Sequence, residues 1–284
     1  MENAINLCDV LPSNEASQKY LDQVLSQDFT YNRVYIGSYF CSNKFFSVKS
    51  RSIIRLIDTF ASKGIPISLV VPIFAQHHLS KGIELIQKIA NDYYGTIDEI
   101  VVNDLGMLQH MYDIYKSKAN RIKIVAGRML NKTYRDIRDE EYFSLECIPK
   151  CLNEYYISLY EHYGIQTIEL DNSFNSLTLP EKFNKFCFAV HTPLCYVTKC
   201  NICEFASITK SISQKFRTTD TCSYECMGRY IQYSNGNDNT VIHYKIGCGV
   251  YFENKSINIK TDKIRTIYNP YLDEVQHANF SSIK

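Results

Sequence analysis

The chain repeats one local pattern along most of its length: a short apolar run, an amphipathic stretch, and then another apolar run. The apolar runs are rich in Val and Ile with little polar alternation, which is typical of strands buried on both faces. Three amphipathic stretches, 50–64, 79–95 and 148–164, end in glycine, a residue that commonly terminates helices. This recurring strand–helix order predicts parallel βαβ units.

Seven candidate strands follow this pattern, and they are 5–11, 33–38, 66–74, 99–104, 121–127, 167–172 and 186–191. An eighth candidate within 241–253 brings the number to that of a closed barrel. We therefore expect an α/β fold, a TIM-like (β/α) barrel, whether regular, irregular or incomplete, with a β-rich C-terminal segment. An open doubly wound sheet is the alternative, although no Gly-rich phosphate-binding turn follows the first strand. Residues 1–230 are assigned to the barrel-like domain and 231–284 to a closing segment of the same domain.

The formal net charge of +1 predicts no strong attraction to nucleic acid or to an anionic membrane. No apolar run approaches the roughly 20 residues that span a bilayer, and the N-terminus lacks the features of an export signal. We expect a cytoplasmic protein without a transmembrane segment. Eleven cysteines are many for a reducing compartment, where disulfides rarely persist, so the clustered ones favour metal ligation.

Five of the cysteines fall within 36 residues: Cys195, Cys200, Cys203, Cys222 and Cys226. Another, Cys41, follows the second predicted strand. Thiolates bind zinc, copper(I) and iron–sulfur clusters in preference to hard cations. Spacing leaves two kinds of site open. One is a local zinc knot of Cys200, Cys203, Cys222 and Cys226. The other is an iron–sulfur cluster that uses Cys41, one cysteine near 200 and the Cys222/Cys226 pair. The remaining cysteines are interpreted as small buried hydrophobes: Cys8, Cys147, Cys151, Cys187 and Cys248.

In a parallel barrel the chemistry lies at the carboxyl ends of the strands. Polar residues follow several predicted strands there, and we take six as candidate substrate-binding residues: Asn103, Asp104, Arg128, Asn131, Asp171 and His191. Each also has a structural interpretation, because Asp caps helices, Asn and Asp stabilise turns, and a buried His is often simply hydrogen-bonded. No catalytic residue is assigned. The chain has neither a HExxH nor a Gly-x-Ser-x-Gly motif, so peptide hydrolysis is the least favoured chemistry.

Four segments, in this order, resemble segments of the collagenase-like (U32-type) peptidase family: VYIGSYFCSNKFF (34–46), EIVVNDLGMLQ (99–109), HTPLCYVTKC (191–200) and DTCSYEC (220–226). The resemblance is closest to the UbiU/UbiV-type iron–sulfur subunits of oxygen-independent ubiquinone hydroxylation. It departs from the family pattern at Ser38, where the family often has Glu, and at 197–199, which replaces a Ser-x-Arg sequence.

The resemblance implies a barrel-like fold and a 4Fe–4S cluster held by Cys41, Cys200, Cys222 and Cys226, with Cys195 and Cys203 as neighbours. It also implies a component of an oxygen-independent hydroxylase that works as a heterodimer with a homologous subunit. The substrate would be a small molecule such as a quinone precursor, with prephenate as the oxygen donor; other family members hydroxylate RNA bases. The alternatives are a zinc-stabilised or cluster-bearing interaction protein without catalytic activity, or a family member that hydroxylates RNA.

Overall fold

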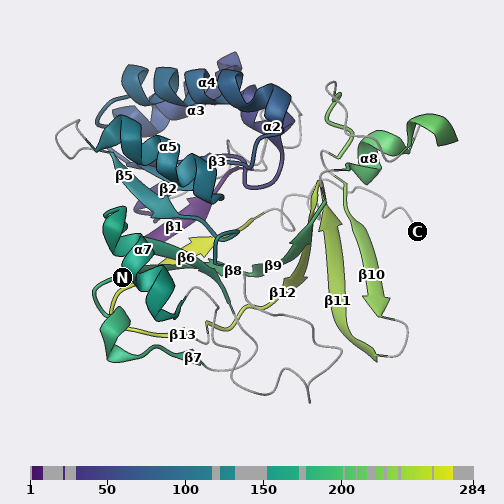
Figure 1. Ribbon diagram of the computed structural model, residues 1–284. Coiled ribbons are helices and arrows are strands. Elements are labelled where there is room, and N and C mark those ends of the chain that lie inside the picture. Colours follow the sequence, from purple (N-terminus) through teal and green to yellow (C-terminus); the bar gives the residue numbers. More distant parts are fainter. Residues whose placement is uncertain are drawn as a thin grey trace.

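The structure, a computed structural model, describes residues 2–8, 22, 30–116, 122–131, 152–172, 177–200, 202–208, 210–215, 222–226, 229–235, 238–257 and 259–270. Eight parallel strands form a closed barrel in the order β1-β14-β8-β6-β5-β4-β3-β2 (Figure 1). The TIM-like α/β fold predicted from the sequence is confirmed. Among the described residues, no helix is long and apolar enough to cross a membrane.

The barrel strands are β1 (Glu2–Asn6), β2 (Arg33–Gly37), β3 (Ile67–Val71), β4 (Ile97–Val102), β5 (Lys123–Ala126), β6 (Thr167–Asp171), β8 (Cys187–Thr192) and β14 (Ile264–Tyr268). The seven strands predicted first overlap β1 to β6 and β8. The first of them is displaced, because β1 ends at Asn6 and residues 9–11 lie outside the described part of the chain.

The helices are α2 (Ser42–Phe46), α3 (Arg51–Ser62), α4 (Leu79–Asp92), α5 (Leu105–Tyr115), α7 (Glu154–His162) and α8 (Glu204–Ser207), with 3₁₀ turns η1 (Ser47–Lys49), η2 (Gln76–His78), η5 (Glu181–Phe183) and η6 (Ile212–Gln214). The predicted helix 50–64 corresponds to α3. Ser50 caps its N-terminus by accepting a hydrogen bond from the Ile53 amide at 3.5 Å. Most of its apolar residues, including Leu56 and Phe60, are buried in the hydrophobic core, whereas Ile54 is exposed.

The eighth barrel strand was predicted within 241–253, and this prediction was wrong. That segment contains β11 (Asp238–Ile246) and β12 (Gly249–Glu253), which pair antiparallel through a tight turn at Gly247, where φ is 54°. A two-residue turn can join only antiparallel neighbours, because parallel strands need a long crossover. The barrel is instead closed by β14, which pairs with β8 on one side and β1 on the other.

A second sheet lies beside the barrel, in the order β10-β11-β12-β9 (Figure 1). It contains β9 (Leu194–Lys199), which follows β8 directly, and β10 (Ile231–Asn235). A short parallel pair, β7 (Leu177–Thr178) with β13 (Ile259–Lys260), completes the described strands. The segment 231–284 thus contributes strands to the second sheet and one strand to the barrel.

The barrel interior is filled in layers. Small and branched side chains occupy its middle, among them Val70, Val101, Val125 and Ile267. Below them, at the amino ends of the strands, lies an ionic network in which Glu99 accepts hydrogen bonds from Arg265 Nη1 at 2.7 Å and Nη2 at 2.9 Å. Ser68 Oγ donates to the same carboxylate at 2.7 Å. The amino end of the barrel is therefore closed by paired charges and not by apolar side chains.

Acid should weaken the fold through Glu99. Burial alone would raise the pKa of this carboxyl, but Arg265 and Arg33 outweigh burial and lower the pKa from 4.5 to about 2. Because the folded pKa lies below the unfolded one, the stabilisation is complete above about pH 4.5 and is lost as the pH falls towards 2. We expect Glu99→Gln to remove about 3 kcal/mol of the pH-dependent part of the free energy of unfolding. Denaturant unfolding between pH 2 and 5 measures it, with exposed Glu84→Gln as the control.

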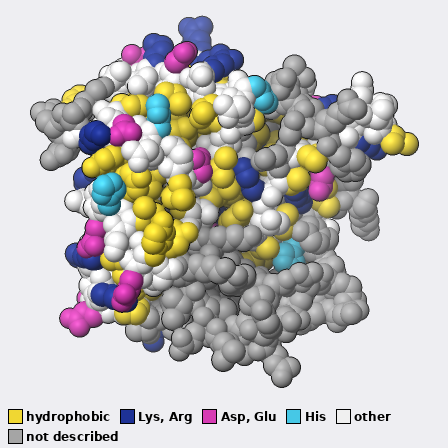
Figure 2. Space-filling view, in the orientation of Figure 1, with side chains coloured by type: hydrophobic (Ala, Val, Ile, Leu, Met, Phe, Trp, Pro, Cys, Tyr) yellow, Lys and Arg dark blue, Asp and Glu magenta, His cyan; other side chains and the backbone are white. Residues whose placement is uncertain are grey.

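The face shown in Figure 2 carries Lys and Arg side chains interspersed with Asp and Glu over its described part. On the described part of that face, no single sign of charge gathers into a large patch.

Candidate functional site

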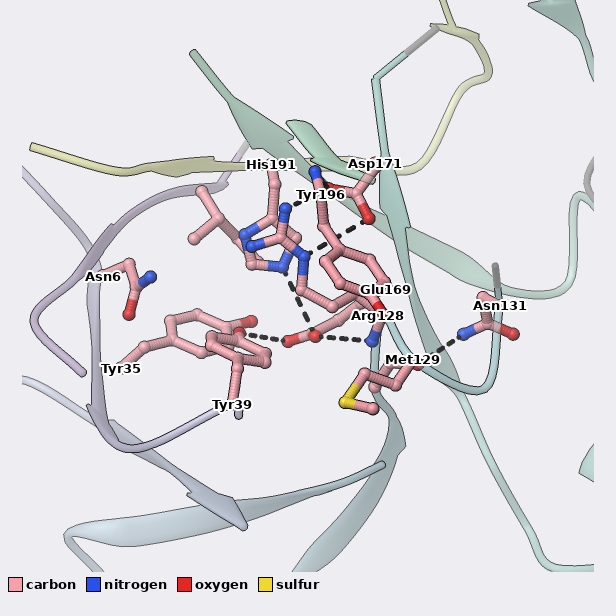
Figure 3. A network of polar contacts seen from close by, with 12 residues as sticks. Asn6, Tyr35, Tyr39, Arg128, Met129, Asn131, Glu169, Asp171, His191 and Tyr196 are labelled. Atoms are coloured by element: carbon pink, nitrogen blue, oxygen red, sulfur yellow. Dashed lines mark hydrogen bonds and ion pairs between the residues drawn. The ribbon is translucent and has the colours of Figure 1, made fainter. Parts of the chain in front are cut away.

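A buried ion pair lies at the carboxyl end of the barrel (Figure 3). Arg128, directly after β5, pairs with Asp171 at the end of β6, and both side chains are almost fully buried. Arg128 also donates to the Leu194 carbonyl at 3.0 Å. Burial opposes the charge, but Asp171 more than compensates, so the pKa of Arg128 lies above its ordinary value. Asp171 in turn accepts a hydrogen bond from the Tyr196 amide at 2.7 Å.

Four aromatic rings surround the Arg128 guanidinium. Its central carbon lies 5.4 Å from the ring centre of Tyr39, 5.9 Å from those of Phe40 and Tyr196, and 5.8 Å from that of Tyr251. A cation over aromatic faces is attracted by the ring quadrupoles. Tyr39 and Phe40 follow β2, whereas Tyr196 and Tyr251 belong to β9 and β12. The Arg128 guanidinium therefore contacts rings of both the barrel and the second sheet and stabilises the packing of one against the other.

Glu169 links the same ion pair to His191, and the sequence interpretation missed it. Its carboxylate accepts hydrogen bonds from the Tyr39 hydroxyl at 2.9 Å and the Arg128 amide at 3.1 Å, and lies 3.4 Å from His191 Nε2 (Figure 3). Burial, followed by the charge of Arg128, lowers the pKa of His191. The available signal was alternation: Glu169 and Asp171 are two residues apart on one strand, so both face the barrel interior.

The other candidate residues support backbone. Asn103 donates to the Val71 carbonyl at 2.9 Å, and Asn131 donates to the carbonyls of Ala126 and Gly127, each at 3.0 Å. Asp104 accepts from the Met107 amide at 2.8 Å as the N-cap of α5. The structure thus brings Arg128, Asp171 and His191 together in one network. Asn103, Asn131 and Asp104 instead hold loops and a helix start in place.

A cavity of about 120 Å³ lies at the carboxyl ends of β2 and β3. Five cysteines line it, and we call it the thiol cavity: Cys41, Cys203, Cys222, Cys226 and Cys248. They come from the loop after β2, from the start of α8, from the segment 222–226 and from the turn between β11 and β12. Residues separated by about two hundred positions in the sequence therefore present thiols to one small space.

Local contacts fix these segments. A Cβ on Gly37, where φ is 126°, would lie 2.1 Å from the Val70 carbonyl oxygen, so only glycine allows the turn from β2 towards Cys41. The Cys41 amide donates to Ser38 Oγ at 3.1 Å. Tyr224 donates its hydroxyl hydrogen to the Asn43 carbonyl at 3.2 Å, which ties the Cys222–Cys226 segment to α2.

The thiols of the cavity share hydrogen bonds. A side-chain hydrogen bond with Cys248 lowers the pKa of Cys41 to about 6, against the opposing effect of burial, and the same interaction lowers the pKa of Cys203 to about 6. The pKa of Cys248 is raised correspondingly. Burial is the main reason that the pKa of Cys222 rises to about 12. Cys41 and Cys203 therefore ionise more readily than Cys222 and Cys248.

The structure adds to the sequence interpretation of three cysteines. Cys248 was interpreted as a small buried hydrophobe; it is buried, but it also lies in the turn between two strands and on the wall of the thiol cavity. Its flanking residues, Gly247 and Gly249, were the available signal for a turn. Cys200, a ligand in the resemblance, lies at an exposed position off the cavity wall, whereas its neighbour Cys203 lines the cavity. Cys195 is buried within β9.

The fold and the site together define a closed (β/α) barrel protein with a thiol-lined cavity at the carboxyl ends of its strands. No protein-family model matches the sequence, and no curated protein matches it. A solved structure, "The Structure of the U32 Peptidase Mk0906", is similar to this chain, with a TM-score of 0.46 and 8% sequence identity, over 94% of this chain and 92% of that chain.

Proposed function

We propose that the chain is the cluster-bearing subunit of an oxygen-independent hydroxylase-type complex, with a 4Fe–4S cluster in the thiol cavity. The observation that carries the proposal is that cysteines from four separate segments line one small cavity. A cubane cluster is held by four thiolates. Cys41, Cys222 and Cys226 belong to the ligand set that the resemblance implies, and the geometry favours Cys203 over Cys200 as the fourth ligand.

The donor set fits a centre held by thiolates. Among the described residues, no group of three or more His, Cys, Asp or Glu side chains is arranged to hold one metal ion. A zinc ion binds each of its sulfur ligands at a Zn–S distance of about 2.3 Å. In a cubane each thiolate binds a different iron, so the four sulfurs stand farther apart around a larger body. The cavity wall offers five thiols, which is more than the four that either kind of centre requires.

When bound, such a cluster would supply electron transfer or a Lewis-acidic iron. The chain's own contribution is to hold the thiolates and to close the site from the side of the second sheet. The substrate class, a small quinone-precursor-like molecule, and the homologous partner subunit rest on the four-segment resemblance alone. Co-purification from the native host that recovers a related chain would support the heterodimer, and a lone, fully active chain would contradict it.

A zinc-stabilised interaction protein is the second candidate, and one observation favours it. Cys248 interacts with both Cys41 and Cys203, so three thiols lie close to one another. Spacing of that kind is nearer to the tetrahedral S₄ site of structural zinc. Metal analysis of the purified chain separates the two candidates.

Cys203→Ser is expected to deplete the anaerobically purified chain of most of its iron, because a serine hydroxyl is a far poorer ligand for iron than a thiolate. The wild type should contain about four irons and as many sulfides per chain. Exposed Cys200→Ser is the matched control and should keep the wild-type content. The reverse result would make Cys200 the ligand, as the resemblance implies. Stoichiometric zinc without iron in the wild type would reject the cluster.

A further inference from the structure

Lys199 has a buried amine with no hydrogen-bond partner among the described residues. It is the last residue of β9 and lies opposite Gly249 of β12. The amide of the next residue, Cys200, donates to the Cys248 carbonyl at 2.9 Å, so the end of β9 runs beside the turn that carries Cys248. The charges that act most strongly on the amine are those of Cys248, Cys41 and Asp104.

An unpartnered buried ammonium group destabilises a protein, because burial removes its hydration and nothing replaces it. Buried lysines are therefore usually paired with an anion. Burial is the dominant influence on Lys199 and lowers its pKa, while the neighbouring thiols act in the opposite direction. Asp104 and the thiols act on the amine through their charge alone, because no described residue accepts a hydrogen bond from it.

A second lysine lies at the same cavity. Lys44 of α2 is buried and lines the thiol cavity, and its Nζ lies 3.7 Å from the position that a Cβ on Gly247 would occupy. The Lys44 charge also acts on the Cys41 thiol. Two cations from separate elements thus approach thiols that become negative when they bind metal. A centre held by four thiolates carries net negative charge, and its reduction adds one more.

We propose that Lys199 is a positioning residue that holds a positive charge against an anionic thiolate-ligated centre and so favours the metal-loaded and reduced forms of that centre. This inference rests on the proposed function. It explains why a buried amine is kept beside a cavity of thiols, where an apolar residue of similar volume would suit the metal-free chain better.

Lys199→Met tests the inference because it should change the two forms of the protein in opposite directions. In the metal-free chain it removes the unpartnered amine and should raise the Tm above that of the wild type. In the loaded chain it should lower the midpoint potential of the cluster. A tenfold weaker preference for the reduced state corresponds to about 59 mV for a one-electron couple. Lys199→Arg, which keeps the charge, should retain most of the wild-type potential.

Lys63→Met is the matched control, because it removes the same charge from an exposed position at the end of α3. It should leave both measurements unchanged. Equal potentials in the wild type and Lys199→Met, or a lower Tm of the metal-free variant, would overturn the inference while leaving the cluster proposal intact. If the wild type holds zinc instead, a tenfold loss of zinc affinity in Lys199→Met upholds the inference and rejects the cluster. A wild type without either metal rejects both.

Discussion

Replacing Arg128 by leucine is expected to lower the free energy of unfolding by about 3–5 kcal/mol, the usual effect of breaking a buried ion pair. The carboxylate of Asp171 would remain buried and lose its cation. The four rings around the guanidinium would also lose their shared contact, and with it the attachment of the second sheet. Equilibrium denaturant unfolding near neutral pH measures the loss.

The double variant Arg128→Leu/Asp171→Leu is the control for this prediction. Removing both charges leaves no unpaired ion, so the double variant should be more stable than Arg128→Leu alone. Arg128→Lys should rescue only part of the loss, because an ammonium group cannot reproduce the planar fork that pairs with Asp171 and stacks on rings. If Arg128→Leu lowered the free energy of unfolding by less than about 1 kcal/mol, other interactions would be compensating for the lost ion pair.

Replacing Cys41 by alanine is expected to abolish metal loading, the largest effect of any single change at the thiol cavity. Cys41 is the one barrel-rim thiol among the proposed ligands, and its loss leaves the cluster with three. Iron and sulfide per chain should fall from about four to near zero. The metal-dependent rise in stability should vanish as well, which amounts to about 4 kcal/mol for a ligand present at a thousandfold over its Kd.

Cys195→Ala is the matched control for Cys41→Ala. Cys195 is also a cysteine of the same region, but it is buried within β9 and does not line the thiol cavity. This variant should load the wild-type amount of iron. A Cys41→Ala chain that kept its iron would show that the late cysteines form a centre by themselves, as the local zinc knot requires.

The barrel could be predicted because its signals are local. A helix that ends in glycine and a Val/Ile-rich strand can each be predicted from their own residues, as the match between 50–64 and α3 illustrates. The eighth strand could not be placed in this way. Its Thr266 and Arg265 give β14 a mixed polar pattern, and its burial between β1 and β8 depends on partners more than seventy residues away.

The site was predictable only in part, for the same reason. The position of Cys41 after a strand placed it on the rim without further information. Cys248 reaches the thiol cavity because a hairpin turn folds back over the barrel mouth, and no local pattern indicates where a hairpin will pack. Asp104 shows the opposite difficulty: a helix cap and a binding residue have the same appearance in sequence, and here the structure shows the cap.

Closure by β14 has a consequence for the timing of assembly in the cell. Glu2 of β1 pairs with Arg265 of β14, so the ribosome must translate past residue 265 before the ring of strands can form. Cys41 and Cys248 meet under the same constraint. The proposed cluster would therefore be inserted only after residue 264 has been translated, and nascent chains halted before that residue should emerge without it.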